Sequence, residues 1–248
     1  MPRMKREQSS TGIYHVVFRG INRQRIFEED EDYERFLSLL KHYQQISEYS
    51  IYAYCLMPNH IHLLIKEGTE PLGQTFRRIG ASFVYWYNLK YGRAGHLFQD
   101  RYKSEVVEDD GYLLTVVRYI HRNPVKAGLC REPEEYRYSS FARYESDPLI
   151  ESSLVLGMTG RKEFFNYHHT DSKDLCLDVE EEKKRRLTDQ DAIRLMTELY
   201  HCSNPSEFQE AEKETQDKIL HTLLGAGGSL RQISRLTGAP IGIVRKNA

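Results

Sequence analysis

The stretch Met57-Pro58-Asn59-His60-Ile61-His62-Leu63-Leu64-Ile65 places two histidines two residues apart inside an apolar run that is typical of a buried strand. Side chains alternate between the two faces of a strand, so His60 and His62 are expected on one face and Ile61 and Leu63 on the other. Two imidazoles on one rigid strand can bind one divalent metal ion. The alternative is two core or edge histidines bonded to the backbone, because 10 histidines make a chance triplet common.

The segments on either side of this strand predict further strands and helices. The expected strands are residues 14–18, 51–57 and 101–107 together with the histidine strand, and the expected helices are residues 29–47, 72–91 and 109–122. Pro58-Asn59 is a tight turn, so strand 51–57 and the histidine strand should form an antiparallel hairpin. The third helix is expected to stop at Asn123-Pro124, because the residue before a proline disfavours helical backbone.

The order of these elements is β-α-β-β-α-β-α, which predicts an α+β fold. The first six elements match the ferredoxin-like, split-βαβ plan, in which two helices cover one face of an antiparallel sheet. The third helix is an addition to that plan. We expect this domain to span residues 1–146.

The remainder of the chain divides into a connector and a second domain. Residues 147–186 have weak periodicity and end in a charge run, which indicates a partly helical connector. Residues 187–248 contain an apolar helix near Leu220 and two further helices over 230–236 and 241–246, separated by a glycine-bearing turn. This spacing is typical of a helix-turn-helix DNA-binding domain, although a small structural three-helix cap fits the same pattern.

Composition excludes several classes of protein. The net charge is −1 and the pI is about 6.8, so the chain lacks the overall positive charge that is typical of many nucleic-acid-binding proteins. The first 25 residues are nevertheless basic. The 4 cysteines are far apart in sequence, which argues against a thiolate zinc site and a disulfide framework. The chain has no apolar run near 18 residues and no signal-peptide core. We therefore expect a cytoplasmic protein without a membrane partner.

A candidate nucleophile and a third metal ligand lie on the third helix. Tyr119 and Asn123 are four residues apart and therefore share one face of the helix. The asparagine oxygen could complete a metal site with two imidazoles, and the tyrosine could then attack a phosphate held by that metal. A phenol adduct conserves the energy of a broken DNA linkage, whereas attack by water would lose it. Tyr112 is the main rival nucleophile, and Tyr102 is a weaker one.

Taken together, these motifs resemble the single-tyrosine HUH transposases, and specifically the branch of REP-associated tyrosine transposases within the insertion-sequence-200-like family. The matching segments, which lie between about residues 10 and 145, are Tyr14-His15-Val16, Arg19-Gly20, Leu56 to Leu64, Gly95 to Lys103, Arg118 to Leu129 and Tyr136 to Ser140. The resemblance implies that residues 1–146 are the catalytic domain. The helix-turn-helix would be an additional DNA-binding domain.

The resemblance also implies an activity and its residues. His60 and His62 would be the metal pair, Asn123 the third ligand and Tyr119 the nucleophile, with Mg²⁺ or Mn²⁺ as the ion. The reaction would be cleavage of single-stranded DNA that leaves a 5′-phosphotyrosine and a free 3′-OH, followed by transfer to another strand end. The substrates would be palindromic repeats folded as hairpins. The protein could act as a monomer or as a homodimer.

Basic residues near the proposed site and on the C-terminal helices are expected to contact DNA. They are Arg19, Arg23, Arg25, Arg77, Arg101, Lys103, Arg118, Arg122, Arg231, Arg235 and Arg245. Two other functions fit the same sequence. One is a domesticated, non-catalytic protein that binds hairpin DNA or regulates transcription. The other is a replication or conjugation initiator, which is disfavoured because the sequence has no G-x-x-x-x-G-K loop.

Overall fold

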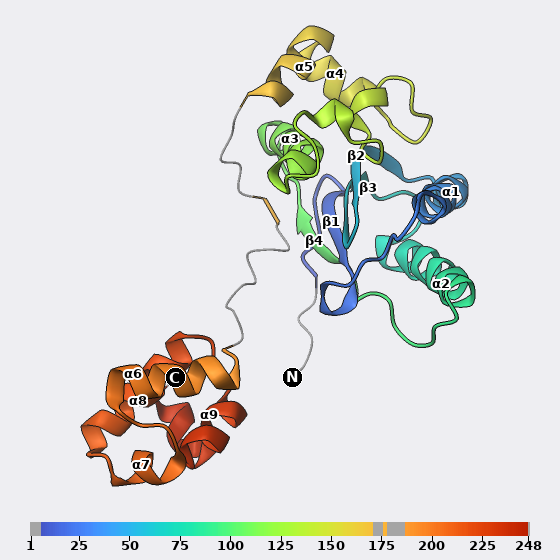
Figure 1. Cartoon of the computed structure of the whole chain (residues 1–248). Helices are drawn as coiled ribbons and strands as arrows, with labels where there is room; N and C mark the ends of the chain where they lie inside the picture. The colour runs from blue at the N-terminus through green and yellow to red at the C-terminus, as the bar shows by residue number, and fades with distance from the viewer. Residues whose placement is uncertain (1–5, 171–175, 178–186, 248) are drawn as a thin grey trace. The chain divides into compact units, whose positions relative to one another are not determined.

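The computed structural model describes residues 6–170, 176–177 and 187–247. The chain divides into two compact units, residues 1–179 and 180–248, and each is described by itself. Figure 1 shows the sheet and its helices in the first unit and the all-helical second unit. Within the described ranges, no helix combines the length and the apolar character that a membrane span requires.

A four-stranded antiparallel sheet forms the centre of the first unit, which confirms the expected α+β class. Its strands are β1 (Ile13–Arg19), β2 (Ser50–Met57), β3 (His60–Lys66) and β4 (Lys103–Val106), in the spatial order β2-β3-β1-β4. The turn at Pro58-Asn59 joins β2 to β3 as the predicted hairpin. Strand β4 begins two residues later than the sequence predicts.

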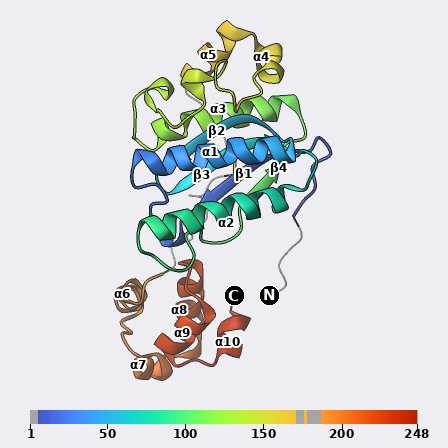
Figure 2. The ribbon, with the colours of Figure 1, turned by 90° about the vertical axis from the view of Figure 1, so that its right-hand side faces the viewer.

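Helices α1 (Asp30–Ser47) and α2 (Leu72–Lys90) cover one face of this sheet, as Figure 2 shows. Both helices carry an apolar stripe that meets the odd-numbered side chains of β3 and the even-numbered side chains of β1. Phe18 and Ile61 belong to this core and are buried. The alternation that buries Ile61 on this face therefore directs His60 and His62 to the other one.

Helix α3 (Asp110–Lys126) covers the opposite face of the sheet. Its buried residues pack against Phe141, Tyr144 and Phe164, which follow it in the chain. The short helices after α3 are η2 (Pro133–Glu135), η3 (Phe141–Arg143), α4 (Ser153–Thr159) and α5 (Arg161–His169), and η1 (Ile21–Arg23) follows β1. Residues 153–169 were expected in the connector, but their helices pack into the first unit. The charge run at 180–186, which was also expected in the connector, lies outside the described residues.

Helix α3 does not end at Asn123-Pro124, so that prediction was wrong. The helix continues to Lys126 with Pro124 inside it. Proline lacks the N–H that would bond one turn back, so the helix forgoes one bond at Pro124 and continues for only two further residues. The backbone N–H groups of Ala127 and Leu129 bond to the carbonyls of Asn123 and Pro124, each at 2.9 Å. Asn123 is therefore held on the helix.

The second unit consists of five helices in its described part. They are α6 (Asp189–Tyr200), α7 (Pro205–Glu210), α8 (Lys213–Gly225), α9 (Leu230–Thr237) and α10 (Ile241–Lys246). Ser229 caps α9 by accepting a bond from the Gln232 N–H at 3.2 Å, and Gly238, at φ +71°, ends it. The three predicted helices are present, whereas α6 and α7 were not predicted. All five contribute to one small apolar core.

Candidate catalytic and metal-binding site

The two histidines of the H-x-H motif lie on strand β3 and face helix α3. His62 is fully buried, whereas His60, at the start of the strand, is partly exposed. Their ring centroids are 5.0 Å apart and the rings are nearly perpendicular, at 83°. Strand β1 pairs with β3 so that Val17 lies opposite His62 and Arg19 opposite His60. The predicted alternation of faces is therefore present in the structure.

Asn123 on α3 brings its amide to both imidazoles. Its Oδ1 atom lies 3.3 Å from His60 Nε2, and its Nδ2 atom lies 3.3 Å from His62 Nε2. The amide oxygen and nitrogen are assigned from such contacts, so a half-turn of the amide exchanges them. Two imidazole nitrogens and one amide oxygen thus converge on one place. This mixed donor set fits a divalent ion that also keeps positions for phosphate oxygens or water.

The electrostatic setting of His62 favours a neutral ring. Burial, together with the neighbouring His60, His15 and Lys126, lowers the pKa of His62 well below its ordinary value. A neutral imidazole keeps a lone pair on one nitrogen, and only that form can bind a cation. His62 is therefore ready to act as a ligand at neutral pH.

His15 on strand β1 contacts the side of the His62 ring that faces away from Asn123, a role that was not predicted. The ring of His15 is fully buried, and its Nε2 atom lies 3.0 Å from His62 Nδ1. On the other side, His15 Nδ1 lies 3.6 Å from an oxygen of Glu105 on β4. Burial raises the pKa of the Glu105 carboxyl, but bonds from His15, Tyr112 and Leu177 outweigh it, so the pKa is lowered. A carboxylate, an imidazole and a candidate ligand therefore lie in one chain of contacts.

Tyr119 packs against this chain from helix α3. It is 5% exposed, and its ring centroid lies 5.7 Å from that of His62 and 5.8 Å from that of His15. Lys126 Nζ lies 5.4 Å from the centroid of the tyrosine ring. No role for Lys126 was predicted, although it follows Tyr119 by seven residues and so shares its face of the helix. Tyr119 therefore has two imidazoles and one ammonium group around its ring.

The two rival tyrosines have different surroundings. Tyr102 packs against Phe18 and Phe76, on the sheet face that α1 and α2 cover. Tyr112 lies two turns before Tyr119 on α3, where burial and a bond to Glu105 raise its pKa. Tyr119, in contrast, packs with its ring edge against His62 and His15.

The expected DNA-contacting residues fall into separate groups. Arg118 stacks on Tyr167, 3.8 Å from the ring centroid, and Arg122 donates to the carbonyl oxygen of His168 at 2.7 Å. These two arginines therefore hold α3 against α5. Arg19 and Lys103 lie on the sheet near the histidines, since Arg19 pairs with His60 and Lys103 is opposite Val17 in the strand register.

The other predicted basic residues lie away from the histidines or in the second unit. Arg25 pairs with Glu28 at 3.3 Å, and Arg23 is exposed at the end of η1, at φ +62°. Arg77 and Arg101 line a cavity on the α1 and α2 side of the sheet. The basic residues of the second unit are exposed, and they are Arg231, Arg235 and Arg245. Of these, Arg235 pairs with Asp189 at 2.6 Å.

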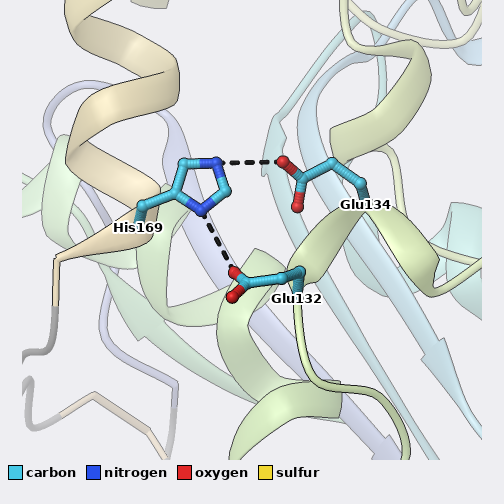
Figure 3. A group of neighbouring side chains, drawn as sticks. All are labelled: Glu132, Glu134 and His169. Carbon is cyan, nitrogen blue, oxygen red and sulfur yellow. Dashed lines mark hydrogen bonds and ion pairs between the residues drawn. The ribbon is translucent and has the colours of Figure 1, made fainter.

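A separate histidine–carboxylate cluster lies on the surface of the first unit. Figure 3 shows His169 of α5 between Glu132 and Glu134, at 3.1 and 2.9 Å. In the described part of the chain, these three side chains form a group of histidine and acidic residues close enough together to hold a metal ion. Both ring nitrogens already face carboxylates, so in this arrangement the cluster joins α5 to η2. It is distinct from the predicted metal residues.

The chain is similar to several known proteins. Residues 8–123 match the family model described as transposase IS200 like. A Haemophilus influenzae protein assigned to the REP-associated tyrosine transposases is 26% identical over 154 residues, which cover 58% of this chain and 87% of that protein. The Escherichia coli REP-associated tyrosine transposase is 26% identical over 97 residues, which cover 38% of this chain and 56% of that protein.

A solved structure supports the same relationship at the level of the fold. The structure of a REP-associated tyrosine transposase bound to a REP hairpin matches 72% of this chain and 99% of its own, with a TM-score of 0.52 and 19% identity. The family resemblance that the sequence predicted is thereby confirmed.

Proposed function

We propose that this chain is an IS200-like transposase, and that it acts as a metal-dependent endonuclease and strand transferase on single-stranded DNA. The match of residues 8–123 to the IS200-like family model and the similarity to REP-associated tyrosine transposases support the choice of family. The observation that carries the proposal is the convergence of His60, His62 and Asn123 beside the ring of Tyr119. A protein that only bound DNA would have no need of this set. We further propose that the sheet follows the ferredoxin-like plan, which its β2-β3-β1-β4 order supports.

In the proposed reaction, the Tyr119 phenol oxygen attacks a backbone phosphorus atom. A P–O bond to the tyrosine forms as the bond to the 3′ oxygen breaks, which leaves a 5′-phosphotyrosine and a 3′-OH that takes up a proton. A bound Mg²⁺ or Mn²⁺, held by His60, His62 and Asn123, would offset the charge that develops on the phosphate oxygens. The 3′-OH of another strand end then attacks the phosphotyrosine, which restores the phenol. No ATP is needed, because each step exchanges one phosphoester for another.

The chain's own residues supply orientation and charge for this step. Free tyrosine has a pKa near ~10, so little phenolate exists at neutral pH. In the proposal, the ammonium group of Lys126, 5.4 Å from the centre of the Tyr119 ring, supplies positive charge near the attacking phenol. His15 and Glu105 hold the His62 ring in place, which leaves its Nε2 atom directed at Asn123.

The substrate proposed for this site is a DNA strand that folds into a hairpin. A solved relative with this fold is bound to a REP hairpin. We also propose that α9 and α10 form a helix-turn-helix that adds a second grip on DNA. Its support is the capped α9, the Gly238 turn and the exposed Arg231 and Arg245.

The test is covalent capture of the strand. The protein is mixed with Mn²⁺ and a pool of labelled single-stranded hairpins with randomised flanks, then denatured and separated by size. We expect a protein–DNA adduct with the wild type and with the control Tyr112→Phe, and none with Tyr119→Phe, which should still bind the strand. A Tyr119→Phe adduct at the wild-type level would remove Tyr119 from the proposed role.

A further inference from the structure

A cavity of about 700 Å³ lies on the sheet face opposite the histidines, within the first unit. Its walls come from the end of β1, from one side of α2 and from residues 96–102. This volume is in the range of small-molecule sites and is large enough for one nucleotide. The reaction proposed above does not use it.

Helix α2 opens the cavity by carrying glycine where a side chain would fit. Gly73, Arg77 and Gly80 lie on one side of the helix, and all three line the cavity. A Cβ atom at Gly80 would meet nothing within 4 Å in the described part of the chain beyond its own helix backbone and neighbours. Glycine inside a helix costs about 1 kcal/mol relative to alanine. Packing does not require a glycine here, and the absence of a large side chain at this position keeps the cavity open.

The floor of the cavity is aromatic. Phe18 is in contact with Phe76 and Phe98, at centroid separations of 5.0 and 5.5 Å. Tyr102 closes this group, 4.9 Å from Phe76. Arg6 fixes Tyr102 from outside, since its guanidinium lies 3.8 Å over the ring and donates to the Tyr102 carbonyl oxygen at 2.8 Å. Such a floor matches the flat, apolar face of a nucleobase.

The rim of the cavity is basic. Arg6, Arg77 and Arg101 line it, and Asp100 is the acidic residue among its described lining residues. Asp100 Oδ1 accepts the Arg101 backbone N–H at 2.8 Å. Three guanidinium groups against one carboxylate leave a net positive rim, which suits a phosphate group.

The cavity lies at the end of the sheet that also carries His60. In the β1–β3 register, Phe18 of the cavity floor is opposite Ile61, and the next residue, Arg19, is opposite His60. One DNA strand could therefore reach both places by passing over the end of the sheet. A base held on one face would fix which phosphate arrives on the other.

We propose that this cavity binds one unpaired nucleotide of the DNA strand, with the base on the aromatic floor and the phosphate at the arginine rim. The proposal rests on the proposed function for its choice of DNA as the ligand. It adds a second binding place, on the other face of the sheet, that would set the position of the strand relative to Tyr119.

The test measures binding of single-stranded oligonucleotides that carry 2-aminopurine, a fluorescent base, at one position. The protein carries Tyr119→Phe, so that no strand is cut. Gly80→Leu fills the cavity, while the matched control Gly80→Ala adds one methyl group. We expect Gly80→Leu to weaken binding about tenfold or more and to abolish quenching of the base, and Gly80→Ala to change neither. Thermal melts establish that both variants fold.

A second variant keeps the test independent of the helix. Arg77→Gln should weaken binding several-fold and lower the dependence on salt by about one charge, whereas Arg35→Gln, on the exposed side of α1, should do neither. Wild-type affinity in both Gly80→Leu and Arg77→Gln would overturn the proposal. Tighter binding of a free deoxynucleoside monophosphate than of the strand would also overturn it in favour of a nucleotide site.

Failure of the proposed function would look different. If the wild type forms no covalent adduct, but Gly80→Leu still loses binding and quenching, then the cavity holds a base and only the chemistry is wrong. If adducts form while Gly80→Leu binds as the wild type does, then the chemistry stands and the cavity proposal falls.

Discussion

At the scale of single residues, His62 is held from three directions. His15 lies behind its Nδ1 atom, Asn123 in front of its Nε2 atom, and Tyr119 against the edge of its ring. A buried side chain with contacts on all sides keeps one rotamer, so the direction of its lone pair is fixed before any cation arrives. His60, at the partly exposed start of β3, lacks such complete enclosure.

Removing an imidazole should separate metal binding from DNA binding. His60→Ala deletes one proposed ligand at a partly exposed place, so the fold should be kept. We expect Mn²⁺ affinity, measured by calorimetry without DNA, to fall by at least about tenfold and adduct formation with it. Binding of single-stranded DNA without metal should not change. The control is His42→Ala on the outside of α1, and unaltered Mn²⁺ affinity in His60→Ala would exclude His60 as a ligand.

His15 should act by positioning His62. In His15→Phe a ring of similar size fills the same place but cannot bond to His62 Nδ1, so the metal affinity should fall by about 10- to 100-fold. His15→Gln can restore part of this bond and should recover part of the affinity. Nuclear magnetic resonance of labelled histidines provides a second readout, because the His62 ring should lose its single tautomer. A role in packing alone predicts that His15→Phe keeps wild-type affinity.

At the scale of elements, α5 is joined to α3 by buried histidines. His121 Nδ1 lies 2.8 Å from His168 Nε2, and His121 Nε2 lies 2.8 Å from the Ser140 hydroxyl. His168 Nδ1 in turn lies 2.7 Å from the Phe164 carbonyl oxygen. Burial lowers the pKa of His121 well below its ordinary value and that of His168 to about 4. Both rings are therefore neutral in the folded chain at neutral pH.

This arrangement predicts that acid loosens the first unit. In the unfolded chain His168 takes up a proton below pH ~6.5, whereas in the folded chain it does so only below about pH 4. The free energy of unfolding is therefore highest above pH ~6.5 and decreases as the pH falls. The free energy of unfolding should drop by about 2 kcal/mol between pH 7 and pH 5 for this residue.

Urea unfolding at the two pH values is the measurement. The single tryptophan, Trp86, lies on α2, so its fluorescence reports on the first unit alone. His168→Gln should reduce the difference between pH 7 and pH 5 even if it lowers stability at both, whereas the exposed His96→Gln should leave the difference unchanged. If the free energy of unfolding changes equally between pH 7 and pH 5 in His168→Gln and in the wild type, then His168 is not the residue that makes the first unit sensitive to acid.

The same elements show which features a sequence can predict. Alternation along β3 placed His60 and His62 together, and helical spacing placed Tyr119 with Asn123, because both patterns are local. The role of His15 depends on the β1–β3 register, which no short segment specifies. Helix α3 runs past its expected end at Pro124 to Lys126, and the backbone N–H of Leu129 bonds to the Pro124 carbonyl oxygen there, which the sequence pattern did not indicate.

Helices outside the central sheet were predicted less completely, for other reasons. The helices α4 and α5 fall within the predicted partly helical connector, but they are short and pack against α3, for example through Phe164, which no local pattern indicates. By contrast, α6 and α7 carried readable signals. Thr188 caps α6, and Asn204 before Pro205 caps α7.

At the scale of the whole molecule, charge is arranged locally. The net charge is −1, yet the cavity rim and the exposed arginines of the second unit are basic. Each unit has its own apolar core. The two proposed phosphate-binding places, on units with separate apolar cores, should contribute separately to affinity for DNA.

The last prediction tests that separation in the full-length chain. Arg231→Gln combined with Arg245→Gln removes two exposed cations from the second unit without touching its core. We expect weaker binding of long hairpin DNA, with a salt dependence reduced by about two charges, because two phosphate contacts would be lost. Adduct formation at saturating DNA should be unchanged, since Tyr119 and its neighbours belong to the first unit.

The matched control and a deletion complete the test. Arg194→Gln with Lys218→Gln removes two cations of the same unit that already pair with Glu198 and Glu214, and it should leave the salt dependence as it is. Deleting residues 187–248 should weaken binding at least as much as the double arginine variant, yet spare adduct formation on a short strand. If both the arginine variant and the deletion keep wild-type affinity and salt dependence, then the second unit is a structural cap. A DNA-binding domain must contribute positive charge to the complex, and removing it must therefore lower the salt dependence.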